Sequence, residues 1–270
     1  MSVDETGQHK TGQVAASAAE IYEAFFVPAL FIDWPVQVLT AADVGPGNHV
    51  LDIACGTGIL ARHAAAVIGS KGSVTGVDIN EGMLAVARKQ NPNITWELGA
   101  AESLPFDPGT FDRVVSQFGL MFFNEPVQSI SEMRRVIRPG GKIGVAVWAS
   151  LEDTPGYAAV ANLLNELFGP EVARSIEAPY SLGDTQKLGA LFDAGGVHDV
   201  TIETIPGKAR FDSIESWIYT DIKGWTLAEV IDDDGYERLR REASKKLSRF
   251  VLADGSVEFD APAHIVTAAA

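Results

Sequence analysis

The stretch that decides the fold is Val50-Leu51-Asp52-Ile53-Ala54-Cys55-Gly56-Thr57-Gly58, an apolar run that breaks into a glycine turn. The run up to Ile53 is short and rich in branched apolar residues, so it predicts a buried strand. Gly56 and Gly58 let the backbone turn sharply and let a ligand approach without a Cβ in the way. Apolar residues at helical spacing follow from Ile59 to Ile68, and a helix beginning there presents free N–H groups to a ligand. The stretch therefore predicts a cofactor site.

Composition limits the classes of protein to consider. The 270 residues are 46% hydrophobic, enough for one domain or, as we prefer, one domain with a cap. A net charge of -15 argues against nucleic acid and anionic membranes as partners and favours a neutral or cationic small molecule. The single cysteine excludes an internal disulfide, and no apolar run approaches membrane-spanning length. Residues 1–10 are polar, so we do not expect them to act as a signal peptide. We expect a cytoplasmic protein with no metal site, and its oligomeric state stays open.

Strands and helices alternate after the glycine turn. The sequence predicts seven strands, at 50–53, 73–78, 94–98, 111–117, 142–148, 197–205 and 262–268. Such alternation is typical of an α/β fold, here a doubly wound, mostly parallel seven-stranded sheet with helices on both faces and helical cap insertions. Ligands of these sheets bind at the carboxyl ends of the strands. The loops expected to converge there are 54–58, 101–103 and 116–119, with Asp78 beside them.

The flanking segments are expected to serve this core. Residues 1–14 are predicted to be disordered, 15–148 to form lid helices plus the cofactor-binding core, and 149–270 to complete the sheet and carry a helical cap at about 151–193 and 213–252. In the lid, a helix should stop at Pro28 and a second should begin after a capping Asp33. Tyr22 and Trp34 are the lid aromatics most suited to touch a ligand, because their rings carry a polar group.

Asp78 ends the second predicted strand 20 positions after Gly58. An acidic residue at about this distance accepts hydrogen bonds from ribose hydroxyls in nucleotide-binding βαβ units. Asp78 could instead cap the helix that follows it. Its spacing to the glycines favours the ribose role.

Four motifs follow one another along the chain: the opening stretch, Gly76-Val77-Asp78-Ile79-Asn80-Glu81-Gly82-Met83-Leu84, Ala101-Glu102-Ser103-Leu104-Pro105-Phe106 and Met133-Arg134-Arg135-Val136-Ile137-Arg138-Pro139-Gly140-Gly141. Each motif alone is weak, and their order and spacing together make the signal specific. Together they resemble the class I, seven-strand, Rossmann-like S-adenosylmethionine-dependent methyltransferases, in particular the bacterial small-molecule group that includes quinone-biosynthesis C-methyltransferases. The resemblance covers about residues 22–148 and is loose beyond them.

The resemblance implies a role for each motif. Asp52 and the backbone of Ala54, Gly56, Thr57 and Gly58 would hold the amino-acid end of S-adenosylmethionine, and Asp78 would bind its ribose. Ile79 and Met83 would cover the faces of the adenine, and Ala101 and Glu102 would meet its edge. Ser116 and Gln117 would border the methionine portion and the substrate. Ala54 departs from the glycine that many members of the family have at this position.

The implied reaction is in-line displacement at the sulfonium methyl, with the product S-adenosylhomocysteine. Aromatic side chains on the later loops and cap helices suggest a small, apolar or aromatic acceptor. The pocket walls expected are Tyr22, Phe118, Met121, Phe122, Trp148, Trp217, Tyr219 and Trp225. Tyr22, Asp33, His198 and His264 are candidates for a general base, and the sequence does not choose among them. The acceptor atom stays open.

Two other functions compete with this interpretation. Gly56-Thr57-Gly58-Ile59-Leu60-Ala61 also fits a nicotinamide-binding turn, and Tyr219 and Lys223 have the spacing of short-chain dehydrogenases, although they lie far beyond the fifth strand. A non-catalytic S-adenosylmethionine-binding protein is the other alternative, because a fold and a cofactor site do not prove chemistry.

Overall fold

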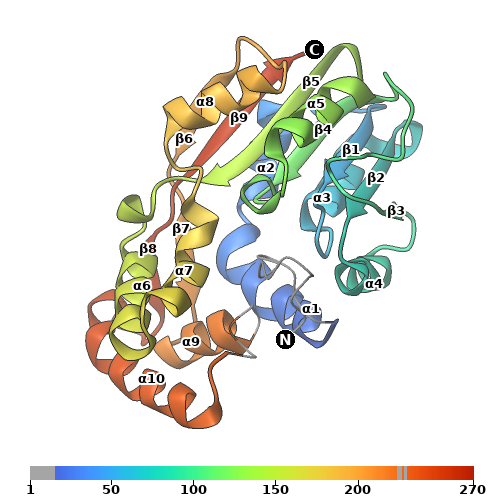
Figure 1. Cartoon of the computed structure of the whole chain (residues 1–270). Helices are drawn as coiled ribbons and strands as arrows, with labels where there is room; N and C mark the ends of the chain where they lie inside the picture. The colour runs from blue at the N-terminus through green and yellow to red at the C-terminus, as the bar shows by residue number, and fades with distance from the viewer. Residues whose placement is uncertain (1–15, 224–226, 228–229) are drawn as a thin grey trace, which may run out of the picture.

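The computed structural model describes residues 16–223, 227 and 230–270 (Figure 1). The predicted disorder of residues 1–14 and the pocket residue Trp225 lie outside this part of the chain. The main sheet has seven strands in the order β3-β2-β1-β4-β5-β9-β6. Antiparallel pairing is confined to β9 with β5 and β6, and the other pairs are parallel. The strands are β1 His49–Ile53, β2 Ser73–Asp78, β3 Thr95–Leu98, β4 Phe111–Gln117, β5 Ile137–Trp148, β6 Thr201–Ile205 and β9 Ala263–Ala269.

Helices cover both faces of this sheet. α2 (Trp34–Ala41), α3 (Ile59–Ile68) and α4 (Glu81–Gln90) pack on one face, and α5 (Pro126–Val136) and α8 (Thr185–Ala194) pack on the other. Successive residues of β1 alternate between the two cores, with Val50 in the first and Leu51 in the second. The predicted α/β fold is thereby confirmed.

The remaining elements lie beyond the carboxyl ends of the parallel strands. They are α6 (Pro155–Phe168), α7 (Pro170–Glu177), α9 (Ile214–Lys223), α10 (Asp233–Lys246) and an antiparallel ribbon of β7 (Lys208–Phe211) with β8 (Val257–Asp260). The N-terminal segment, α1 (Ala16–Ile21) and η1 (Tyr22–Phe31), lies between these elements and α4 (Figure 1). Short helical turns are η2 Gly69–Lys71, η3 Leu120–Phe122, η4 Leu151–Asp153, η5 Ala178–Tyr180 and η7 Ser248–Phe250.

The prediction for the lid helices was wrong in two details. The first helix does not stop at Pro28 but widens into a π-helix that contains it. Proline cannot donate the usual i→i−4 bond, and the wider turn ends with the N–H of Ile32 donating to the carbonyl of Val27 at 2.9 Å. Asp33 occupies the N-cap position of α2 without making a capping bond. Its carboxylate instead accepts a bond of 2.9 Å from Arg210.

Several other boundaries differ from the prediction, in the sheet as well as in the cap. The strand predicted at 197–205 begins only at Thr201, and β5 begins at Ile137, well before the predicted start. The helical region predicted at about 213–252 contains the separate helices α9 and α10. The ribbon of β7 and β8, and helix α7, were not predicted.

The described residues include no single helix that is long and apolar enough to cross a membrane. One pair, Ala19–Phe31 with Trp34–Ala41, meets the length and composition of a span only when joined across a bend of 66°.

Candidate functional site

The glycine turn after β1 is held in a left-handed conformation and pinned to β2. Ala54, Gly56 and Gly58 have φ of +54°, +56° and +88°. The N–H of Cys55 donates to the carbonyl of Val77 at 3.0 Å. A Cβ on Gly58 would lie 2.3 Å from the Trp96 ring, whereas a Cβ on Gly56 would have no neighbour within 4 Å. Gly58 is therefore required by packing, and Gly56 borders open space.

Ala54 fits its position because of a glycine elsewhere. A Cβ on Gly119 would lie 2.6 Å from the Cβ of Ala54 and 3.1 Å from the hydroxyl oxygen of Ser116. The absence of a side chain at Gly119 therefore leaves room for the Ala54 methyl group. The methyl group of Ala54 is thus accommodated by the loop after β4.

Asp78 binds the backbone of the glycine turn. Its Oδ2 accepts from the N–H of Gly56 and its Oδ1 from the N–H of Asn80, both at 2.8 Å. Asn80, not Asp78, caps α4, by accepting from the N–H groups of Gly82 and Met83. Burial raises the pKa of Asp78, while the two N–H bonds oppose that rise. The helix-cap alternative is thus wrong, and Asp78 faces the cavity with spare acceptor capacity.

Asp52 is a buried acid whose carboxylate oxygens lack hydrogen-bond partners among the described residues. It is 1% exposed, and neither carboxylate oxygen has a partner that meets hydrogen-bond geometry among the described residues. Burial raises its pKa well above the ordinary value, the backbone N–H of Ala61 opposes this rise, and the charge of Asp78 adds to it. An unpaired buried acid is costly to the fold. Asp52 lines the cavity, so a cationic ligand group there would supply the missing partner.

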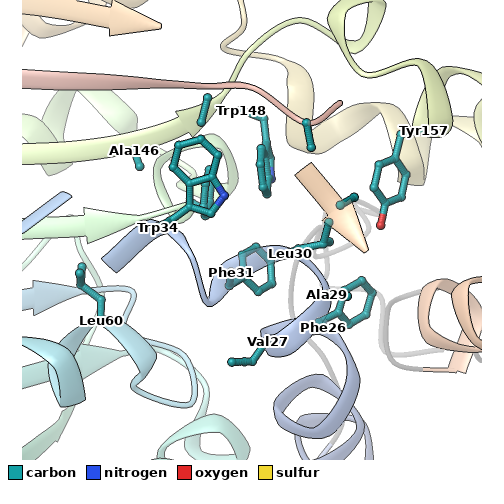
Figure 2. Packing of buried hydrophobic residues seen from close by; sticks show 14 of the residues in the cluster. Phe26, Val27, Ala29, Leu30, Phe31, Trp34, Leu60, Ala146, Trp148 and Tyr157 are labelled. Atoms are coloured by element: carbon teal, nitrogen blue, oxygen red, sulfur yellow. The ribbon is translucent and has the colours of Figure 1, made fainter. Parts of the chain in front are cut away.

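A cavity of about 480 Å³ joins the strand ends to the lid and the cap. Its aromatic wall includes Phe118 and Trp148, stacked at 3.8 Å between ring centroids, with Phe31 6.1 Å from Trp148. Figure 2 shows Phe31 and Leu30 of the lid below Trp148, and Tyr157 on the cap side. The predicted site residues that line the cavity are Tyr22, Asp52, Ala54, Gly56, Thr57, Asp78, Ile79, Met83, Glu102, Gln117, Phe118, Phe122 and Trp148.

Other predicted site residues lie outside the lining, namely Trp34, Gly58, Ala101, Ser116, Met121, Trp217 and Tyr219. Trp34 is buried behind the wall, with its ring edge-on to Trp148 at 5.9 Å (Figure 2). Trp217 is fully buried against Phe259, at 4.6 Å between ring centroids. Tyr219 is 37% exposed and packs edge-on with Phe25. Large aromatic side chains in these helices thus build the cap core more than the cavity.

Several cavity residues were not predicted, chiefly Phe31 of the lid and Tyr157, Tyr180 and Asp221 of the cap. They belong to no motif, and only the packing of α6, η5 and α9 brings the last three together. One signal was available for Asp221. It follows Trp217 by four positions and precedes Ile222, so it places an acid on the apolar face of a helix.

The four candidate general bases differ in whether they lie at the cavity. His198 is exposed and bonded to Asp193, and Asp33 is on the surface with Arg210. His264 is buried between the hydroxyl of Thr204 and the carbonyl of Gly183, at 2.9 Å from each. Of the four candidates, only Tyr22 lines the cavity, and burial and the charge of Asp78 raise its pKa.

Comparison with known proteins agrees with this geometry. A family model described as a methyltransferase domain matches residues 50–141. The demethylmenaquinone methyltransferase of Staphylococcus epidermidis is 31% identical over 188 residues, which are 64% of this chain and 78% of that protein. The ubiquinone/menaquinone biosynthesis C-methyltransferase of Laribacter hongkongensis is 33% identical over 202 residues, 72% of this chain and 81% of its own.

Solved structures share the fold. The YcgJ protein of Bacillus subtilis has a TM-score of 0.59 at 19% identity, covering 88% of this chain and 97% of its own. A phosphoethanolamine N-methyltransferase of Haemonchus contortus, in complex with S-adenosyl-L-methionine, has a TM-score of 0.61 at 21% identity, covering 96% of this chain and 58% of its own.

The chain belongs to the class I S-adenosylmethionine-dependent methyltransferases. It is a methyltransferase that resembles quinone-biosynthesis enzymes, and S-adenosylmethionine is its cofactor. The nicotinamide alternative is not favoured, because Lys223 lies over the ring of Tyr236, 5.1 Å from its centroid, rather than at the glycine turn.

Proposed function

We propose that the protein transfers a methyl group from S-adenosylmethionine to a small aromatic acceptor of the hydroquinone type. The observation that carries this proposal is the aromatic wall of Phe31, Phe118 and Trp148, which continues directly from the acidic end of the cavity. Flat aromatic acceptors stack well on such a surface. The names of the relatives, which specify menaquinone and ubiquinone intermediates, support the same class.

The cofactor would lie across the strand ends. Asp52 would pair with the ammonium group of the methionine portion, and Asp78 would accept from the ribose hydroxyls. Ile79 and Met83 would enclose the adenine with Ala101 and Glu102 near its edge, and Gln117 would border the methionine portion. Gln117 already donates to the carbonyl of Phe31 at 3.3 Å, which links the lid to this end of the cavity.

Bound S-adenosylmethionine supplies an activated methyl group on a positively charged sulfur. The protein's own contribution is to hold the acceptor in line with that methyl group and to exclude water. The lid, with Tyr22 and Phe31, would cover the cavity, and the walls of Phe118 and Trp148 would fix the plane of the acceptor. We also propose that residues 15–148 form the lid and cofactor-binding core, and that 149–270 complete the sheet and carry the substrate cap.

The test is a methyl-transfer assay with labelled S-adenosylmethionine and a short-chain demethylmenaquinol. Naphthalene-1,4-diol, catechol, a primary amine and a thiol serve as comparison acceptors. We expect transfer to the two naphthalene diols and little to the amine or thiol. Tight binding of S-adenosylhomocysteine without turnover of any acceptor would instead support a non-catalytic cofactor-binding protein.

A further inference from the structure

The cap carries one buried acid that the cofactor roles leave unused. Asp221, on α9, is 1% exposed and lines the cavity. Its Oδ1 accepts from the hydroxyl of Tyr157 at 3.0 Å. Its Oδ2 is buried and has no partner that meets hydrogen-bond geometry among the described residues. The acid is therefore held in position by one oxygen while the other can still accept a bond.

The surroundings of Asp221 are aromatic and uncharged. Tyr157 and Tyr180 lie 6.0 Å apart between ring centroids, and Tyr180 lies 6.5 Å from Trp148. The titratable groups that face Asp221 are Tyr157 from α6 and Tyr180 from η5, and the charge of Asp221 contributes to raising the pKa of each. The charged neighbours on its own helix bind elsewhere, Glu215 to Arg240 and Lys223 to Asp233. No described cation compensates Asp221.

An unpartnered carboxylate oxygen in such a wall lacks a hydrogen-bond donor. The acidic residues at the cofactor end, Asp52 and Asp78, come from strand loops, whereas Asp221 comes from the cap that is expected to meet the acceptor. We propose that Asp221, positioned by Tyr157, binds a hydroxyl group of the aromatic acceptor and removes its proton as the methyl group is transferred. This inference rests on the proposed function and assigns the acceptor end of the same site.

The proton and electron balance is complete for a hydroquinone. The hydroxyl proton passes to Oδ2 of Asp221, and the electron pair left on oxygen is delocalised into the ring. A ring carbon then forms the bond to the methyl carbon while the methyl–sulfur bond breaks, and its electron pair stays on sulfur. The proton on that ring carbon leaves to water, and the ring oxygen recovers its proton from Asp221. One proton is released overall and no external oxidant or reductant is needed.

The ionisation of Asp221 supports this role. Burial raises the pKa of Asp221 to about 8, and the hydrogen bond from Tyr157 and the nearby Trp217 indole oppose the rise. An acid in this range can exchange protons near neutral pH. The rate of methyl transfer should therefore rise with pH, with the midpoint of the rise near this value. We call this rise in the pH–rate profile the limb.

Two variants, Asp221→Asn and Tyr157→Phe, test the role of Asp221 through different effects on the pH dependence of methyl transfer. Asp221→Asn keeps the size of the side chain and should lower kcat about 100-fold or more with the short-chain demethylmenaquinol, and abolish the limb. Tyr157→Phe removes a bond that lowers the pKa of Asp221, so the limb should move to higher pH by about one unit. Tyr180→Phe removes a hydroxyl from the same wall without removing a bond to Asp221. It is the matched control, and its limb should not move.

A binding measurement separates this inference from the proposed function. The quenching of tryptophan fluorescence by naphthalene-1,4-diol is titrated in wild type and Asp221→Asn, each saturated with S-adenosylhomocysteine. We expect at least a 10-fold weaker affinity in the variant at pH 8.5. Equal affinity together with an unchanged pH profile would overturn the role of Asp221 even if wild type is active. Inactivity of wild type with every acceptor, with diol binding that still depends on Asp221, would overturn the proposed reaction and retain the hydroxyl site.

Discussion

Asp52 is the residue whose ionisation should respond most directly to the cofactor. Its pKa is raised by burial in the free protein, and a cationic ammonium group beside it would lower that pKa again. Binding should therefore release protons, and the affinity for S-adenosylhomocysteine should rise with pH between the bound and the free pKa. Calorimetry in two buffers of different ionisation enthalpy counts these protons.

Asp52→Asn should weaken this binding by about 10- to 100-fold, since a hydrogen bond to a charged group contributes roughly 1.5–3 kcal/mol. The number of released protons should fall as well. Asp43→Asn alters an exposed acid that pairs with Lys142, and it should change neither quantity. Unchanged affinity in Asp52→Asn would contradict the ammonium site.

Gly56 allows backbone strain and ligand access to be separated. Gly56 and Gly69 have φ of +56° and +66°, and a Cβ on either would have no neighbour within 4 Å. Replacing either by Val should cost about 1–3 kcal/mol of unfolding free energy, because the side chain enters a left-handed conformation. Only Gly56→Val should also lose S-adenosylhomocysteine binding. Equal binding by the two variants would show that the turn does not face the cofactor.

At the scale of elements, Arg62 of α3 connects the lid to the glycine turn. It donates to the carbonyl of Thr57 at 2.6 Å and pairs with Glu23 of η1 at 2.8 Å. Both side chains are mostly shielded from water, so the pair should be stronger than a surface ion pair. One side chain, Arg62, thus joins the glycine turn to η1 of the lid.

Glu23→Gln should loosen η1 and weaken cofactor binding several-fold. Hydrogen exchange of residues 22–31 measures the loosening, which should be smaller when S-adenosylhomocysteine is bound. Glu20→Gln removes the exposed pair with Lys89 and serves as the control. Equal exchange in both variants and wild type would mean that Arg62 does not hold the lid.

The elements that sequence patterns predicted well are those buried on both faces. Runs such as Val50–Ile53 are apolar because helices pack on each side, so their pattern reflects the sheet itself. The β7–β8 ribbon was not predicted because each strand is short and its partner lies far along the chain. The motifs predicted cavity residues on the loops after β1, β2 and β4, since these loops hold their residues at fixed spacing. The acceptor end depends on helices from three distant segments, which leave no local pattern.

At the scale of the whole molecule, Asp221 should make stability depend on pH. In the unfolded chain its carboxyl ionises near 3.8, whereas in the folded protein it keeps its proton until about pH 8. Between these values the folded state holds a proton that the unfolded state has released. The ionisation of Asp221 therefore lowers the free energy of unfolding as pH rises from about 4 to 8.

Asp221→Asn removes this dependence. The variant should be more stable than wild type at pH 9, by an amount on the order of a few kcal/mol, and should differ little at pH 4. Urea unfolding at the two pH values measures the difference. Asp184→Asn, at the exposed cap of α8 where the pKa is lowered, should show no alkaline gain. A uniform shift of Asp221→Asn at both pH values would indicate altered packing instead of ionisation.

The contact between Ala54 and Gly119 joins the first loop of the sheet to the fourth. Because the methyl group at position 54 occupies the space that a side chain at position 119 would need, neither position can drift independently during evolution. A side chain at 119 would require Ala54 to lose its methyl group or the two loops to move apart, so the effects of substitutions at the two positions are coupled. Both positions line the cavity, so the shape of the cavity at this point is set by the pair and not by either residue alone.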